Sequence, residues 1–196
     1  MHGSDFMTIT KYDIKCPKCN SKNRFKVNDE LDDIKIDDVI NRSIFHLSCK
    51  KCNQDIYVEY PFKISNERFI IHYTPMKKEE IQDDYREYMR ICDTFDDLKE
   101  KLMIYNDNLN DIIVEFIKDF LLNQMDNELK SNSTELRYNG IEGENILFSI
   151  IDQDKIIGCN KVFYDNLMKK MKFKKNKKCV LIDKNTYHKY YKMRLF

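Results

Sequence analysis

The sequence CPKC at residues 16–19 and its counterpart CKKC at residues 49–52 decide the fold of the N-terminal half. Each motif places two sulfurs on one side of a tight turn, and two such turns complete a tetrahedron of thiolates around zinc. The sequence therefore predicts one structural zinc ion per chain, with the ligands Cys16, Cys19, Cys49 and Cys52. Because sulfur would fill every position on the metal, we expect the ion to build structure rather than to activate water.

The sequence leaves two other uses of these cysteines open. Four buried free thiols would need no metal, and a redox centre of the thioredoxin type would use one CxxC motif beside a βαβ unit. Neither motif here has a βαβ setting, and a second motif is unnecessary for redox chemistry. The chain has seven cysteines, an odd number, and shows no export signal. A disulfide framework is therefore disfavoured, and a reducing cytoplasm is the expected compartment.

Residues around the two motifs fit zinc geometry. Asn20 and Asn53 each follow a second cysteine, where the backbone often turns left-handed, and asparagine tolerates that conformation. Lysines inside the motifs would offset part of the thiolate charge: Lys18, Lys50 and Lys51. His46 lies three residues before Cys49, so in a strand it points to the opposite face and is not a predicted ligand.

Composition excludes a strong overall attraction to nucleic acid or membranes. The 34 Lys and Arg residues nearly balance the 33 Asp and Glu residues, so any such affinity must be local. No apolar run reaches the roughly 18 residues of a membrane span, and we expect a soluble protein without membrane association. Residues 1–6, ahead of a second methionine at Met7, are interpreted as a cloning remnant.

Residues 7–92 alternate short β-prone runs with turn residues, which predicts an antiparallel sheet. The expected strands lie at residues 8–15, 24–27, 44–49, 56–60 and 69–73, with a short helix or irregular excursion at 32–42. Two helices follow. Thr94 caps the first, which runs to about Tyr105, and the second has apolar residues at helical spacing from Leu109 to Leu121. We expect that apolar stripe to pack on the sheet.

Residues 134–196 predict a smaller α/β unit. Its expected elements are a hairpin with strands at 145–151 and 155–158, a helix at 162–171, a buried strand at 179–182 and a final helix at 185–193. The predicted class is therefore α+β: an antiparallel β-sheet with a zinc-ribbon-type four-cysteine site over residues 7–92, a helical segment over residues 93–130 that packs on it, and a C-terminal α/β unit.

These features resemble the CpXC domain proteins. The similarity begins at Cys16-Pro17-Lys18-Cys19, includes the second motif and the strand up to Tyr60-Pro61, and continues through residues 85–111. Where that family usually reads CPxCG twice, this chain has Asn20 and Asn53 in place of glycine and Lys50 in place of the second proline. The ligand positions are unchanged. The resemblance implies a zinc-ribbon-like fold, a zinc ion and a C-terminal extension, and it supplies no reaction.

Signatures of common enzyme classes are missing. Gly140, Gly143 and Gly158 cannot form a dinucleotide or Walker loop, and no HExxH, GxSxG or kinase motif occurs. The acidic pairs at 32–33, 37–38 and 83–84 are interpreted as solvated faces, and residues 152–155 as a hairpin tip. The other titratable candidates stand alone in the sequence: His72, His188, Cys92, Cys159 and Cys179. We therefore predict a protein that is not an enzyme.

Two non-catalytic functions remain. Nucleic acid could bind a basic run formed by Lys169, Lys170, Lys172, Lys174, Lys175, Lys177 and Lys178. This run contains a single aromatic residue, Phe173, and the lysine-rich composition of the chain also explains it. The favoured hypothesis is a protein-interaction module whose partner is another protein or a second copy of this chain. Tyrosines suited to such an interface are Tyr57, Tyr187, Tyr190 and Tyr191.

Overall fold

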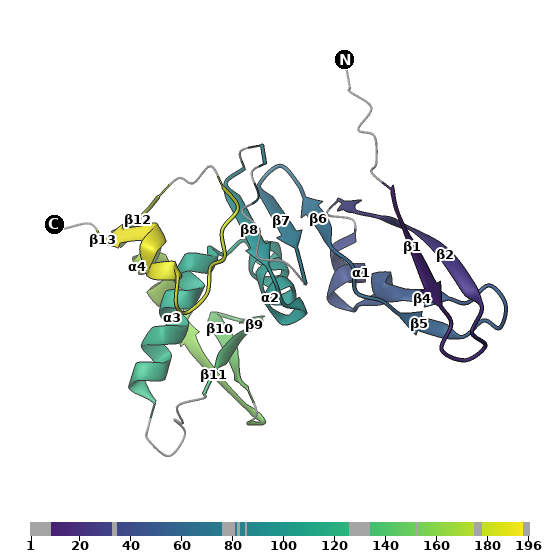
Figure 1. Ribbon diagram of the computed structural model, residues 1–196. Coiled ribbons are helices and arrows are strands. Elements are labelled where there is room, and N and C mark those ends of the chain that lie inside the picture. Colours follow the sequence, from purple (N-terminus) through teal and green to yellow (C-terminus); the bar gives the residue numbers. More distant parts are fainter. Residues whose placement is uncertain are drawn as a thin grey trace. The chain divides into compact units, whose positions relative to one another are not determined.

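The computed structural model describes residues 9–32, 35–75, 81, 83–84, 86–125, 134–151, 153–174 and 178–193. The fold is α+β, with several small sheets and two central helices, as predicted (Figure 1). The chain divides into two compact units, residues 1–98 with 177–180 and residues 99–176 with 181–196. Within the described ranges, no helix has the length and apolar content needed to cross a membrane.

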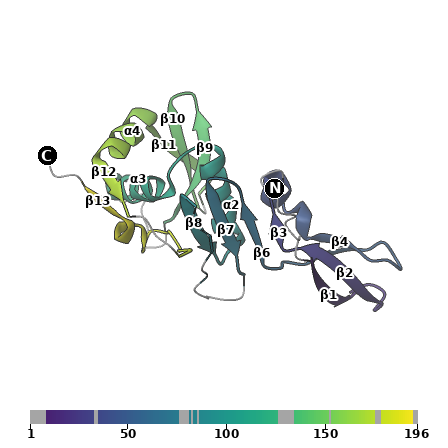
Figure 2. The same cartoon turned by 90° about the horizontal axis from the view of Figure 1, so that it is seen from above.

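Two antiparallel hairpins form a ribbon in the first unit, where Figures 1 and 2 show them side by side. Strand β1 (Ile9–Lys15) pairs with β2 (Lys22–Asn28), and β4 (His46–Ser48) pairs with β5 (Asp55–Tyr57). Each hairpin loop carries one CxxC motif. The small core that the hairpins share consists of Cys16, Phe25, Cys49 and Ile56. Because this core is small, the cysteines of the two CxxC motifs make up a large share of its packing.

A four-stranded sheet completes the first unit, in the order β3-β6-β7-β8. Its strands are β3 (Glu30–Leu31), β6 (Phe62–Ser65), β7 (Phe69–Tyr73) and β8 (Tyr88–Cys92). Only β6 and β7 pair antiparallel, whereas β3 with β6 and β7 with β8 pair parallel. The sheet is therefore mixed, which differs from the predicted antiparallel pairing because β6 and β8 were not foreseen as strands.

An aromatic cluster centred on Phe45 holds the first unit together. The Phe45 ring is fully buried and lies 5.5 Å from the Tyr60 ring and 5.8 Å from the Phe95 ring, measured between centroids. Phe45 is the last residue of the short 3-10 helix η2 (Ser43–Phe45), which follows helix α1 (Ile36–Ile40). Edge-to-face packing of such rings adds to the free energy gained by burying them.

Helix α2 (Phe95–Asn106) begins in the first unit and continues into the second. Thr94 caps it as predicted, since its Oγ1 accepts from the amide of Asp97 at 3.2 Å. Helix α3 (Asp111–Gln124) is capped by Asn110. The apolar side of α3 packs on strand β9 and on two C-terminal elements, α4 and η3. The buried part of that stripe, Leu109 to Ile117, is therefore core of the second unit, whereas Phe120 is exposed. The predicted domain boundaries at residues 92 and 130 stay predictions.

The remaining elements of the second unit include a three-stranded antiparallel sheet, in the order β11-β10-β9. They are β9 (Leu136–Glu142), β10 (Asn145–Ile150), β11 (Lys155–Asn160), helix α4 (Lys161–Lys170), β12 (Met171–Phe173), the 3-10 helix η3 (Tyr187–Tyr190) and β13 (Tyr191–Met193). The hairpin and the helix at 162–171 are confirmed. The predicted final helix is wrong beyond Tyr190, because residues 191–193 pair with β12. In place of the predicted strand at 179–182, the described residues show an isolated bridge between Val180 and Arg90.

A buried cluster of opposite charges lies in the second unit, where helices α2 and α3 face each other. Lys118 Nζ lies 3.1 Å from Glu100 and 2.9 Å from Glu115, and Lys101 Nζ lies 3.2 Å from Glu115. The side chains of these four residues are at most 9 % exposed. Strand β9 joins the cluster because the amide of Tyr138 donates to Glu100 at 2.7 Å. Burying charges is costly, so their mutual pairing is essential for this packing.

Candidate metal centre

The two CxxC loops have the same backbone geometry. In the first loop, the amide of Cys16 donates to the carbonyl of Ser21 at 2.9 Å and the amide of Asn20 donates to Cys16 at 3.0 Å. In the second loop, the equivalent bonds link Cys49 with Gln54 at 2.9 Å and Asn53 with Cys49 at 2.9 Å. Each hairpin therefore presents its two sulfurs in the same way, and the site combines two equal halves.

Both loops turn through the left-handed region, as the sequence predicts. Asn20 has φ 57° and Asn53 has φ 54°. Most residues with a Cβ atom are strained in this region, but the short polar side chain of asparagine reduces the penalty. Asparagine is thus compatible with the turn that presents the two sulfurs in each loop.

The four sulfurs of Cys16, Cys19, Cys49 and Cys52 form one group, all within 4.8 Å of one another. Cys16 Sγ lies 3.6 Å from Cys52 Sγ, and Cys19 Sγ lies 3.7 Å from Cys49 Sγ. A tetrahedral zinc ion with bonds of about 2.3 Å separates its sulfur ligands by about 3.8 Å. The group therefore has the number, type and spacing of ligands that one zinc-sized cation requires.

Two polar residues that the sequence analysis missed surround this group. The Ser21 hydroxyl lies 3.1 Å from Cys19 Sγ and 3.3 Å from Cys49 Sγ. Asn23 is buried, donates to Cys49 Sγ at 3.5 Å, and accepts from the amide of Lys50 at 2.9 Å. Hydrogen bonds of this kind orient metal ligands and stabilise their negative charge. A polar residue on the buried face of β2 is the sequence signal that could have identified Asn23.

Hydrogen bonding and desolvation give Cys19, Cys49 and Cys52 different pKa values. The Ser21 hydroxyl lowers the pKa of Cys49 to about 5 and also lowers the pKa of Cys19. The pKa of Cys52 is raised to about 12, because desolvation and the other three thiols outweigh the lowering effect of the Gln54 amide. Thiols this close cannot all ionise together unless a cation neutralises their charge. The site is thus suited to a divalent cation.

The other candidate ligands lie apart from this group. His46 Nδ1 lies 2.6 Å from Asp55 on the exposed surface of the β4–β5 hairpin, in agreement with its exclusion. Cys92 and Cys179 are buried and Cys159 is half-buried. Burial raises the pKa of Cys159 and of Cys179 to about 11. Protonated thiols are poor nucleophiles, so we expect Cys159 and Cys179 to act as small apolar residues.

The basic run is only partly brought together. Lys169 and Lys170 end helix α4, Lys172 lies in β12, and Lys174 follows that strand. Lys178 belongs to the other compact unit. Lys175 and Lys177 lie outside the described residues. Of the four tyrosines proposed for an interface, Tyr57 is 44 % exposed, whereas Tyr187 is only 7 % exposed and is therefore core.

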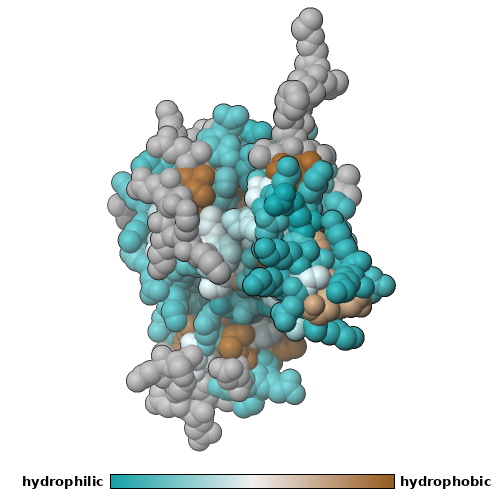
Figure 3. Space-filling view, turned by 45° about the vertical axis from the view of Figure 1, so that its right-hand side comes forward, coloured by the Kyte–Doolittle hydropathy of each residue, from teal (hydrophilic) through white to brown (hydrophobic). Residues whose placement is uncertain are grey.

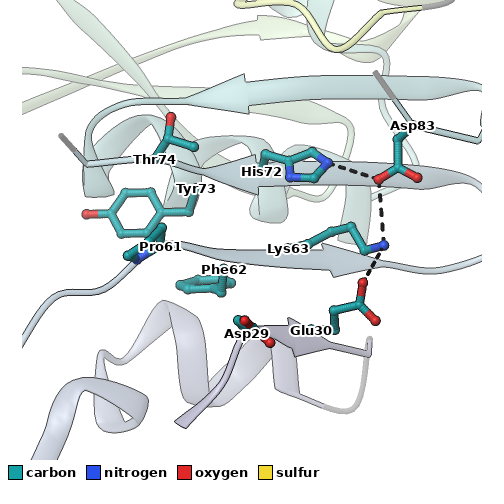
Figure 4. A pocket seen from close by; sticks show the side chains of 9 residues that line it. All are labelled: Asp29, Glu30, Pro61, Phe62, Lys63, His72, Tyr73, Thr74 and Asp83. Atoms are coloured by element: carbon teal, nitrogen blue, oxygen red, sulfur yellow. Dashed lines mark hydrogen bonds and ion pairs between the residues drawn. The ribbon is translucent and has the colours of Figure 1, made fainter. Parts of the chain in front are cut away.

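A second cluster of charged groups lines an open pocket of about 430 Å³ in the first unit (Figure 4). His72 Nε2 lies 3.0 Å from Asp83 Oδ2, and Lys63 Nζ lies 3.6 Å from the same oxygen. Lys63 also contacts Glu30 at 2.8 Å. Strand pairing explains the arrangement, because Lys63 of β6 lies opposite His72 of β7. The prediction of a solvated acidic pair is wrong for Asp83, whose side chain is 19 % exposed.

The charged groups of this pocket stabilise one another. Burial lowers the pKa of His72 even though Asp83 opposes this effect. Burial alone would raise the pKa of Asp83, but the amide of Asp84, His72 and Lys63 together lower it. His72 is therefore neutral and Asp83 ionised at pH 7. These pairs link β6 and β7 to Asp83, and we assign no reaction to them.

Comparison with known proteins agrees with the geometry of the cysteine site. No curated protein and no solved structure matches the chain. The family model described as CpXC protein matches residues 14–118, which is more than half of the 196-residue chain and includes both CxxC motifs. The chain therefore belongs to the CpXC family, with further residues C-terminal to the matched segment.

Proposed function

We propose that this protein is a non-catalytic zinc protein whose ribbon acts as a protein-interaction module. The spacing of the four sulfurs carries the proposal, because 3.6 and 3.7 Å match the edges of a zinc tetrahedron. Cys16, Cys19, Cys49 and Cys52 would hold one ion, which leaves no ligand position for a substrate. The ion then has a structural role: it closes a ribbon whose own apolar core is small.

The surface of the ribbon supports contact with another protein. Strands β1 and β5 each have one neighbour in the described chain, so each has an edge with unpaired backbone groups. Such edges bind extended segments of a partner by adding a strand. Exposed apolar residues are isolated, Ile9 at 56 % and Tyr57 at 44 %, and Figure 3 shows a mostly hydrophilic face with small separate apolar areas. The expected interface is therefore largely polar.

The zinc part of the proposal is tested by metal analysis of the purified chain. We expect about one zinc per chain by native mass spectrometry, lost together with ribbon structure in Cys49→Ser. Cys159→Ser is the matched control. Cys159 lies outside the four-cysteine group, so this variant should keep its zinc. A chain that stays fully folded after complete chelation would contradict a structural role for zinc.

The interaction part is tested with tagged protein recovered from its own cytoplasm, with and without nuclease. A partner that depends on the ribbon should survive nuclease, be lost with Cys49→Ser, and be kept with Cys159→Ser. The purified partner should then bind the purified chain and bind Ile9→Asp more weakly. Equal recovery with Cys49→Ser would show that the ribbon is not the interaction module.

A further inference from the structure

The C-terminal hairpin brings together lysines from two separate stretches of sequence. Strand β12 pairs antiparallel with β13, so that Lys172 lies directly opposite Lys192. The pairing extends one step further, because the amide of Lys174 donates to the carbonyl of Tyr190 at 2.9 Å. Lys174 Nζ also donates to the carbonyl of Lys189 at 2.5 Å. The hairpin thus joins part of the basic run to lysines that the sequence analysis did not connect with it.

Strand alternation sorts these side chains onto two faces. Met171 is 2 % exposed, and the Tyr191 ring stacks on the buried Tyr187 ring with centroids 6.0 Å apart. These residues form the inner face. Lys172 and Lys192 alternate with them, so both point to the opposite, exposed face. Lys174 lies two residues beyond Lys172 and therefore continues the same face.

The outer face of the β12–β13 hairpin is positively charged, and the sequence around both strands supplies no acidic residue to neutralise it. Residues 167–174 and 187–193 contain no Asp or Glu. The nearby carboxylate of Asp119 accepts from the Tyr187 hydroxyl at 3.0 Å, on the inner side of the hairpin. Like charges directly opposite each other destabilise a pair of strands. A polyanion lying along the hairpin would remove this repulsion.

We infer that Lys172, Lys174 and Lys192, together with the exposed Lys189 of η3, whose carbonyl accepts from Lys174 Nζ, bind the phosphates of single-stranded nucleic acid; these four residues are here called the lysine face. Tyr190 is half-buried and its backbone carbonyl accepts from the Lys174 amide at the end of this face, so we expect its ring to offer a base a surface for stacking. Strands of three residues cover only a short length of ligand, which suits a flexible single strand better than the wide surface of a duplex. The site is separate from the zinc centre and does not depend on the proposed interaction module.

The test measures binding of the purified full-length chain to labelled single-stranded DNA and RNA of mixed sequence by fluorescence anisotropy. If four lysines contact phosphates, log Kd should change with log salt with a slope of about 2.8. Raising salt from 50 to 200 mM should then weaken binding about fiftyfold. The double variant Lys172→Gln, Lys192→Gln should reduce the slope by about 1.4, and Tyr190→Ala should weaken binding roughly five- to a hundredfold.

The matched control is Lys22→Gln, Lys26→Gln, which removes the same charge from exposed positions of β2. Circular dichroism of each variant checks that it is folded. The inference is overturned if the control weakens binding as much as the lysine-face variant, because the affinity would then reflect net charge alone. It is also overturned if the chain does not bind, if a duplex binds more tightly, or if anionic vesicles bind with the same dependence on these lysines.

Discussion

The charge cluster between α2 and α3 gives the sharpest prediction of stability. Lys118→Met removes the cation that lies 3.1 Å from Glu100 and 2.9 Å from Glu115, while its side chain keeps most of its apolar volume. Lys118 is 9 % exposed at the side chain, so water cannot replace the lost partner. Breaking a buried ion pair in this way costs about 3–5 kcal/mol. We expect the free energy of unfolding of the second unit to fall by that amount.

The loss should depend on pH in a defined direction. Burial alone would raise the pKa of Glu100, but Lys118, Lys101, the Tyr138 amide and Arg137 together lower it. A lowered pKa stabilises the folded state above the ordinary value of 4.5 and loses that contribution as pH falls through the folded value. The difference between the wild type and Lys118→Met should therefore be largest near pH 7 and shrink below about pH 4.5.

Urea unfolding followed by far-UV circular dichroism measures this effect, because α3 and α4 lie entirely in the second unit. Lys161→Met is the matched control. Lys161 and Asp165 form an exposed helical pair at 3.5 Å, with side chains 45 % and 48 % exposed, and such pairs contribute at most about 0.5 kcal/mol. If Lys118→Met cost no more than Lys161→Met, the cluster would not be essential for packing and the reasoning would fail.

Three further predictions concern the first unit. Ser21→Ala should weaken metal binding about 10- to 100-fold, measured by competition with a chelator, because the hydrogen bonds to Cys19 and Cys49 are lost. Asn53→Val should destabilise the ribbon by about 1–2 kcal/mol, whereas Asn53→Gly should not, since only glycine is unstrained at φ 54°; equal unfolding curves would refute this. Asp83→Asn should cost stability at pH 7 and less as the solution is acidified, because the lowered pKa of Asp83 gives a stabilisation that is complete above the ordinary value of 3.8 and is lost as pH falls through the lower folded value.

The sequence was sufficient to predict those features whose signals come from residues close together in the chain. Two cysteines within one turn identify the ligands without knowledge of the fold, and asparagine after each motif indicates the left-handed turn. The period of apolar residues in α3 identified a helix because its spacing repeats over several turns. Thr94 identified the start of α2, since a hydroxyl that accepts from a nearby amide is a local feature.

Pairing between distant segments could not be predicted in the same way. Strands of three residues, such as β12 and β13, are too short to show a period, so residues 191–193 looked like the continuation of a helix. The parallel pairing of β7 with β8 depends on the path of the chain between them. Asp83 meets His72 and Lys63 for the same reason, and no sequence motif marks that contact.

The division of the metal site between two hairpins has a consequence for biosynthesis. Cys19 and Cys49 are 30 residues apart in the chain. A ribosome needs on the order of a few seconds to add that length, and during this time the nascent chain offers only two sulfurs to a cation. Stable capture of the ion must wait for the second hairpin. If the site holds zinc as proposed, maturation of the newly made protein would then depend on zinc being available at that moment.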